Sequence, residues 1–108
     1  MNLDGKIVQA LAELKIGLER IYGDRLKGMY VYGSYARGTQ RPSSDIDIAF
    51  VLNDFRRPGP EIERTNRLIT DLSLRLDTTI SLVPVREGDF RRKASLLVRS
   101  VAREGIAV

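Results

Sequence analysis

The sequence predicts a small domain of the α/β (α+β) class, with helices packed on a short sheet. Its 108 residues suit one domain spanning residues 1–108, and they contain no internal repeat or linker. The composition, 43% hydrophobic and 30% charged, is typical of a globular domain rather than a disordered chain. Segments with helical spacing of apolar residues alternate with short β-branched and aromatic segments, which indicates helices packed on strands.

The first part of the chain predicts a helix, a strand and a helical turn. Apolar residues recur with helical spacing across Leu3–Tyr22, and Gly23 ends that helix before a turn at Asp24–Gly28. The elements predicted next are, in order, a strand at Met29–Tyr32, a helical turn at Tyr35–Arg37 that Gly38 closes, and a loop at Thr39–Ser44.

The segment Ile46–Leu52 is the clearest strand of the sequence. Its side chains alternate between two faces, of which one carries Ile46, Ile48 and Phe50 and the other Asp47, Ala49 and Val51. Because this run is almost continuously apolar, we expect a central strand that is largely buried on both faces.

The second half predicts two further helices and one further strand. The elements are, in order, an exposed loop at Asn53–Pro60, a helix at Glu61–Leu76, a strand at Thr78–Val83 that Pro84 ends, and a helix at Asp89–Glu104. The apolar stripe of the first of these helices consists of Ile62, Leu68, Ile69, Leu72 and Leu76. We expect Asp89 to cap the last helix, Gly105 to end it, and residues 106–108 to be irregular.

The absence of two residue types limits the chemistry of the chain. Without Cys there is no disulfide, thiolate zinc site or cysteine nucleophile, and without His the usual general base near neutral pH is missing. Carboxylates, hydroxyls, amides and basic groups remain, and a hard cation bound through oxygen suits them. The net charge of +4 suits a polyanionic ligand such as a nucleotide. The sequence has no membrane-spanning stretch or signal peptide, so we expect a cytoplasmic protein.

Two carboxylates mark the start of the predicted central strand. Asp45 and Asp47 are two residues apart, so they project from the same face of the strand. Side by side, their like charges repel, and a divalent cation such as Mg²⁺ would turn that repulsion into ligation. Alternatively, Asp45 ends a loop and Asp47 is solvated at a sheet edge.

A Gly-Ser pair lies between the first predicted strand and the helical turn. Glycine at position 33 lets a phosphate group approach the backbone closely, and the hydroxyl of Ser34 can donate to a phosphate oxygen. The alternative is a tight turn with Ser34 as an N-cap. Because exactly one loop joins this pair to the acidic pair, we expect both to lie on adjacent strands.

Taken together, the two pairs resemble a known family. Ser34 is followed by ten residues and then by Asp45 and Asp47, with Ala36-Arg37-Gly38 between them. This pattern resembles the minimal nucleotidyltransferase (MNT) domains of the DNA polymerase β-like nucleotidyltransferase superfamily, whose signature is Gly-Ser, ten residues and Asp-x-Asp. The resemblance implies a small mixed sheet with helices packed mainly on one face.

The resemblance also implies roles for the residues of the motif. Gly33 and Ser34 would hold the β- and γ-phosphates of ATP or another NTP. Asp45 and Asp47 would be catalytic ligands of Mg²⁺ (or Mn²⁺) for attack of a hydroxyl on the α-phosphorus, with release of pyrophosphate.

The loop of the motif carries two arginines. The guanidinium groups of Arg37 and Arg41 could clamp phosphate oxygens of the nucleotide. The alternative is that they belong to a solvated basic loop with no contact to a ligand.

One position departs from the family pattern. Active members usually supply a third carboxylate from the next strand, where this sequence has Ser81. Asp77 is a candidate third catalytic carboxylate, but it lies four residues earlier, roughly 13 Å along an extended strand. It could instead cap the end of the preceding helix.

The leading functional hypothesis is Mg²⁺-dependent transfer of AMP from ATP to a protein or other hydroxyl acceptor. The resemblance further implies an antitoxin paired with a small helical HEPN-type protein. The competing hypothesis is a non-catalytic module that keeps the fold and masks a partner, which Ser81 favours. We do not expect a nucleic-acid binder, because the sequence has no aromatic-interleaved basic patch.

Overall fold

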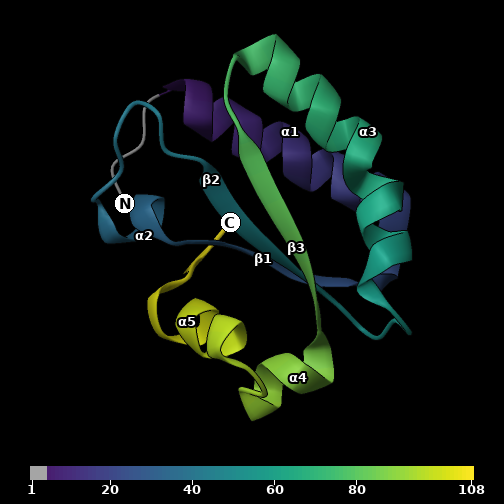
Figure 1. Ribbon diagram of the computed structural model, residues 1–108. Coiled ribbons are helices and arrows are strands. Elements are labelled where there is room, and N and C mark those ends of the chain that lie inside the picture. The colour runs from purple at the N-terminus through teal and green to yellow at the C-terminus, as the bar shows by residue number, and fades with distance from the viewer. Residues whose placement is uncertain (1–4) are drawn as a thin grey trace.

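The computed structural model describes residues 5–108 of the chain (Figure 1). Its elements are, in chain order, α1 (Gly5–Tyr22), the 3₁₀ helix η1 (Gly23–Arg25), β1 (Leu26–Tyr32), α2 (Ser34–Arg37), β2 (Ile46–Leu52), α3 (Pro58–Leu76), β3 (Ile80–Arg86), α4 (Glu87–Arg92), α5 (Leu96–Glu104) and β4 (Ile106–Ala107). The predicted start of the first helix, Leu3, lies outside the described residues. The bounds predicted for the central strand are confirmed.

The strands form a mixed sheet in the order β3-β2-β1-β4. β1 runs antiparallel to β2 and to β4, whereas β2 and β3 run parallel. The parallel pair is joined through α3, because parallel neighbours need a crossover connection. This confirms the predicted class, a small mixed sheet covered by helices.

Different helices cover the two faces of the sheet. In Figure 1, α1 and α3 lie above the sheet and α4 and α5 below it. The main core lies under α1 and α3 and contains Ile48 and Phe50 of β2, both fully buried. A smaller cluster under α4 and α5 contains Ala49 and Val51. The two long helices therefore share one face, and the alternation of β2 predicted which of its side chains enter each cluster.

The two long helices are amphipathic, with one face in the core and the other in solvent. Leu14 of α1 is almost completely buried, and so is Leu72 of α3, which was predicted in the apolar stripe. The prediction for Ile62 was wrong, since its side chain is 49% exposed. Glu61 is buried in its place, because its carboxylate accepts a hydrogen bond from the hydroxyl of Tyr22 at 3.0 Å. Among residues 5–108, no helix is long and apolar enough to cross a membrane.

Two elements begin earlier than predicted, β1 and α3. β1 begins at Leu26, inside the predicted turn, because Leu26 pairs with Leu52 of β2 on the far side of a bulge. α3 begins at Pro58, inside the predicted loop, with proline in its first turn, where the missing N–H costs no helical hydrogen bond.

The third strand also continues past its predicted end. Pro84 was expected to stop it, but β3 extends to Arg86, and Pro84 pairs with Phe50 of β2. β3 is at the edge of the sheet, where a residue without an N–H group is tolerated.

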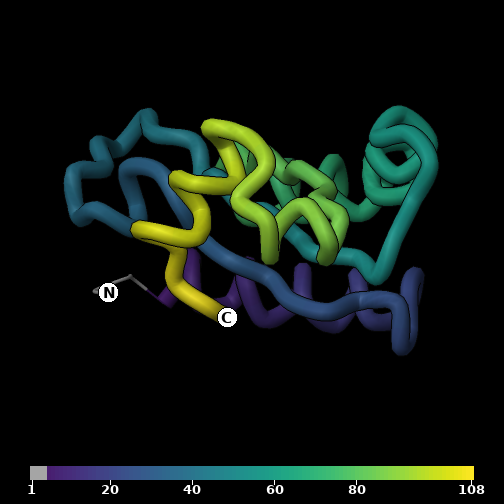
Figure 2. Tube along the Cα trace, turned by 90° about the horizontal axis from the view of Figure 1, so that it is seen from below, coloured from purple at the N-terminus to yellow at the C-terminus, as the bar shows by residue number. Residues whose placement is uncertain are grey.

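The predicted C-terminal helix is two helices with a break between them. Lys93 adopts a left-handed backbone conformation, with φ 53°, and separates α4 from α5. The cap predicted at Asp89 is wrong for the same reason: Ser95 caps α5 by accepting the N–H of Val98 at 3.1 Å. Residues 106–108 were expected to be irregular. Instead, β4 pairs with β1, and Figure 2 shows the yellow C-terminal segment beside the blue strand.

The Ser95 cap leads to a first prediction. Replacing Ser95 with alanine should lower the free energy of unfolding by about 1 kcal/mol, because the N–H of Val98 loses its acceptor. A Ser95→Asp variant keeps an acceptor and should retain most of the stability in urea denaturation. Equal losses in both variants would contradict the role of Ser95 as a cap.

Candidate active site

Pairing of β1 with β2 brings the two halves of the motif together. Tyr32, the last residue of β1, pairs with Asp47 of β2, and Gly33 follows directly. α2 then begins at Ser34, beside the start of β2 (Figure 1). The predicted placement of the Gly-Ser pair and the acidic pair on adjacent strands is therefore what the structure shows.

Gly33 has a conformation and a packing that only glycine accommodates. Its φ of 72° and ψ of −151° lie in a region that residues with a side chain rarely adopt. A Cβ atom at this position would collide with the Oδ2 atom of Asp47. The backbone therefore passes directly against the Asp47 carboxylate, which explains the glycine physically.

The predicted helical turn after Gly33 is present as α2. The N–H of Arg37 donates to the carbonyl of Gly33 at 3.1 Å, and Gly38 closes the turn in a left-handed conformation. The N–H groups at the start of such a turn have no partner within it. Together with the hydroxyl of Ser34, they are suitable donors for phosphate oxygens.

The surroundings of Asp47 disfavour its ionised form. Asp45 is exposed just before β2, and Asp47 is partly buried on the face that α4 and α5 cover. Burial and the neighbouring Asp45 raise the pKa of Asp47 above its ordinary value, while the Arg37 guanidinium lowers it. Burial and Asp47 also raise the pKa of the Tyr32 hydroxyl. A positive partner beside Asp47 would therefore favour its ionised form.

The two loop arginines differ in their surroundings. Arg37 forms an ion pair with Glu104 at the end of α5, with 3.0 Å between Nη1 and Oε1. Arg41 is exposed, and its backbone N–H donates to the Ser44 hydroxyl at 2.8 Å. Only Arg37 is near enough to influence Asp47. The sequence reasoning missed Glu104, for which the only signal was an acid next to the Gly105 that ends the helix.

The third carboxylate position contains a serine. Ser81 of β3 pairs with Asp47 in the parallel register, so the two side chains share a face of the sheet. Asp77 lies outside β3, as the left-handed C-cap of α3, as its helix-capping alternative proposed. It lines a hollow of about 300 Å³ together with Ser43 and Ser44 of the motif loop. The structure thus places Ser81, and not Asp77, beside Asp47.

The oxygen atoms of this site fit a hard cation whose remaining ligands come from a substrate. Mg²⁺ is usually held by one or two carboxylates together with phosphate oxygens, which matches Asp45 and Asp47. No cluster of three or more acidic, Cys or His residues able to hold a metal exists within residues 5–108. The raised pKa of Asp47 and the close approach of Gly33 fit the same donor set.

Two glycines of the motif allow a matched prediction. Gly33→Ala should lower the free energy of unfolding by about 3 kcal/mol, because it adds both backbone strain and a collision with Asp47. Gly38→Ala has a comparable φ of 75° but open space around its Cβ position, so it should cost about 1 kcal/mol. Urea denaturation compares the two, and a larger loss for Gly38→Ala would contradict the close packing of Gly33.

Comparisons with known proteins show which family the chain belongs to. The model of the nucleotidyltransferase domain family matches residues 11–108. The chain is 33% identical over 84 residues to the spectinomycin 9-adenylyltransferase of Staphylococcus aureus, covering 77% of this chain and 32% of that protein. It is 32% identical over 81 residues to the protein adenylyltransferase MntA of Shewanella oneidensis, covering 75% of this chain and 52% of MntA. The chain therefore spans about a third of the length of the first relative and about half of the length of MntA.

Solved structures with the same fold include members of toxin–antitoxin complexes. A toxin–antitoxin structure with AMP-PNP superposes with a TM-score of 0.61 at 30% identity, covering 87% of this chain and 68% of that one. A candidate minimal nucleotidyltransferase superposes with a TM-score of 0.65 at 26% identity, covering 100% of this chain and 97% of that one. With a family match from residue 11 to residue 108 and Gly33 packed against Asp47, the chain belongs to the nucleotidyltransferase domain family, in the group of the minimal nucleotidyltransferases.

Proposed function

We propose that the chain is a Mg²⁺-dependent nucleotidyltransferase that transfers AMP from ATP to a hydroxyl group of a protein. The observation that supports this most directly is the packing of Gly33 against the Asp47 carboxylate, which brings a phosphate-binding turn to an acidic pair. The relatives named adenylyltransferases support ATP as the nucleotide.

Each motif residue has a defined task in this proposal. Gly33 leaves room for the triphosphate, and the Ser34 hydroxyl donates to a phosphate oxygen. Asp45 and Asp47 would hold the cation. When bound, Mg²⁺ would neutralise negative charge on the phosphate oxygens. The acceptor oxygen forms a bond to the α-phosphorus while the bond to the pyrophosphate oxygen breaks, and the hydroxyl proton passes to a base.

The arginines of the motif loop would contribute charge to the nucleotide. Arg37 is held by Glu104 on one side and acts on Asp47 on the other, so it is positioned to contact phosphate oxygens. Arg41 is free to swing toward the same ligand, because its side chain is exposed. We keep Asp77 as the candidate for the base, since it lines the hollow beside the motif loop.

We further propose that the acceptor is a small helical HEPN-type toxin and that the chain acts as its antitoxin. The support is similarity to MntA and to solved toxin–antitoxin structures, one of which contains a tri-AMPylated HEPN toxin with its MNT antitoxin. A toxin modified on a hydroxyl group would fit the transfer of AMP proposed above.

A second candidate function is a module that masks its partner without catalysis. Ser81 favours it, because serine next to Asp47 is a weak metal ligand and a weak base. In that case nucleotide binding could persist while transfer is absent. The two candidates therefore differ in the fate of the nucleotide and not in the fold.

Calorimetric titration of the chain with ATP, with and without Mg²⁺, tests the nucleotide site. We expect binding that requires Mg²⁺. Transfer of label from α-labelled ATP to a co-purified partner then distinguishes the candidates, since only the enzyme labels the partner. If ATP does not bind even with the partner present, the enzymatic proposal is wrong and masking remains.

A further inference from the structure

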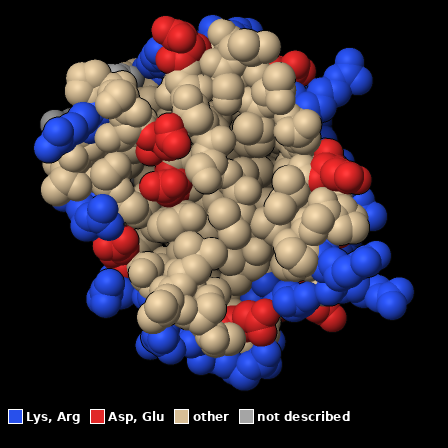
Figure 3. All heavy atoms as spheres, in the orientation of Figure 1, with Lys and Arg blue, Asp and Glu red and all other residues tan. Residues whose placement is uncertain are grey.

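Four arginines surround a hollow at the end of the sheet that lies away from the motif. This basic pocket, of about 390 Å³, is lined by Arg25, Arg56, Arg57 and Arg64, with the ring of Phe55 as an apolar wall. It lies past the last residue of β2, whereas the acidic pair lies at its first residues, roughly 20 Å away. On the face drawn in Figure 3, basic side chains gather at the rim rather than over the middle. We propose that the basic pocket is a second phosphate-binding site, for the phosphate chain of a small oligophosphate.

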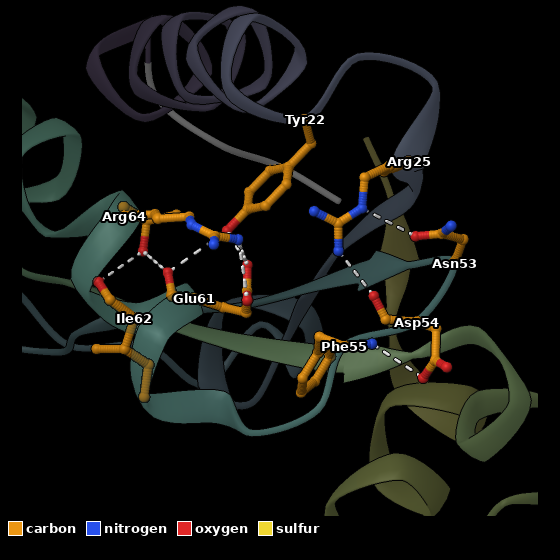
Figure 4. Close-up of polar contacts among 9 residues, drawn as sticks. Tyr22, Arg25, Asn53, Asp54, Phe55, Glu61, Ile62 and Arg64 are labelled. Carbon is orange, nitrogen blue, oxygen red and sulfur yellow. Dashed lines mark hydrogen bonds and ion pairs between the residues drawn. The ribbon is translucent and has the colours of Figure 1, made fainter.

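Arg25 makes no ion pair with an acidic side chain within residues 5–108, and its hydrogen bonds go to other groups. Its Nε donates to Asn53 Oδ1 at 3.2 Å and its Nη2 to the carbonyl of Asp54 at 2.8 Å, so both acceptors are neutral. Its guanidinium carbon also lies 5.6 Å from the centre of the Tyr22 ring. Figure 4 shows the side chain fixed between Tyr22 and the loop after β2. Arg25 is therefore a positioned cation.

The single acid in the lining, Glu61, is already paired. It is 5% exposed, and Arg64 Nη1 donates to both of its oxygens, at 2.9 and 3.1 Å. The Tyr22 hydroxyl adds a third hydrogen bond, and burial, followed by the interaction with Glu61, raises the pKa of Tyr22 to about 12, so that it stays a donor. Arg64 is half exposed, so its remaining N–H groups are available to a ligand in the pocket.

Arg86 of β3 holds the loop that carries the other two arginines. Arg86 donates to the carbonyls of Phe55 and Arg56, at 2.7 and 2.8 Å, and its guanidinium carbon lies 4.5 Å from the centre of the Phe55 ring. The backbone is thereby ordered, whereas the side chains of Arg56 and Arg57 are exposed and make no ion pair within residues 5–108. The loop presents two free cations on an ordered backbone.

The chemistry of the lining points to phosphate. Guanidinium groups form paired hydrogen bonds with the oxygens of phosphate. The lining contains four guanidinium groups and one carboxylate, and that carboxylate is already paired with Arg64. A chain of linked phosphates carries several negative charges, which suits several cations around one hollow. The volume of the hollow is that of a site for a small molecule. The ring of Phe55 offers an apolar surface to whatever organic group the phosphates carry.

The test uses a background in which the motif cannot bind a cation. In the Asp45→Asn/Asp47→Asn variant, with chelator present, we expect inorganic triphosphate to bind with one molecule per chain in calorimetry. Adding Arg56→Ala/Arg57→Ala should weaken binding by about tenfold or more, because two charged donors are removed. The matched control Arg91→Ala/Arg99→Ala removes two exposed arginines from α4 and α5 and should change binding by less than about twofold.

Three results would overturn the proposal. The first is no binding of triphosphate to the chain that keeps all four arginines. The second is equal weakening in the two double variants, which would indicate general attraction to a basic protein. The third is much tighter binding of a short single-stranded oligonucleotide, lost with Arg56 and Arg57, which would assign the pocket to a nucleic-acid backbone. Thermal melting checks that the exposed substitutions leave the fold intact.

Discussion

Replacing both Asp45 and Asp47 with asparagine should reduce Mg²⁺-dependent transfer of AMP by about a hundredfold or more. The amide has nearly the shape of the carboxylate but no charge, so Gly33 can still pack against position 47 while the cation loses its ligands. Release of pyrophosphate from ATP measures the loss. Residual activity close to that of the unmodified chain would show that the acidic pair is not the metal site.

The same variant should be more stable than the unmodified chain at neutral pH. The pKa of Asp47 is raised in the folded state by burial and by Asp45, so its ionised form is less favourable in the folded than in the unfolded chain. This cost is absent below the ordinary pKa of an aspartate, grows as the pH rises between that value and the raised one, and is complete above it. Urea denaturation in chelator should therefore show a gain at pH 7 that disappears in acid. A loss at pH 7 would contradict the strain assigned to the pair.

The sequence predicted β2 and the motif correctly, because in both the environment of a residue depends mainly on residues close to it in the chain. In β2, alternation assigned Phe50 and Val51 to opposite clusters, because both faces of a central strand are covered. The placement of the Gly-Ser pair and the acidic pair on adjacent strands followed from one loop joining two strands, since consecutive strands usually pair. The arrangement of the two halves of the motif could therefore be predicted from the sequence.

Other parts depend on contacts between distant residues. The break at Lys93 lies in a run of residues that favour helix, so local propensity does not predict it. Just before the break, the ring of Phe90 packs on the ring of Tyr30, a residue from β1, with ring centres 5.1 Å apart. The burial of Glu61 depends on a tyrosine 39 residues earlier in the chain. The basic pocket depends on loop and helix residues that only the fold assembles.

Ser81 is the position at which sequence and structure most directly limit the proposed activity. It pairs with Asp47 across neighbouring parallel strands, about 4.8 Å apart, and both side chains project from the same face. A carboxylate there would lie next to the acidic pair and could take the proton of the acceptor hydroxyl. Asp77 does not occupy this strand position, because it caps α3 before β3 begins, so it would have to act from the hollow beside the motif loop.

Replacing Ser81 with aspartate should therefore raise the rate of AMP transfer by about a hundredfold, the usual contribution of a positioned general base. Ser81→Asn is the matched control, since it adds the same volume without the charge, and it should leave the rate unchanged or lower. In chelator, Ser81→Asp should also be less stable than Ser81→Asn, because another carboxylate is placed beside Asp47, whose pKa is already raised, and Mg²⁺ with ATP should remove this difference in stability. Equal rates for the two variants would mean that the base comes from another group, and Asp77→Asn would then be the variant that loses activity.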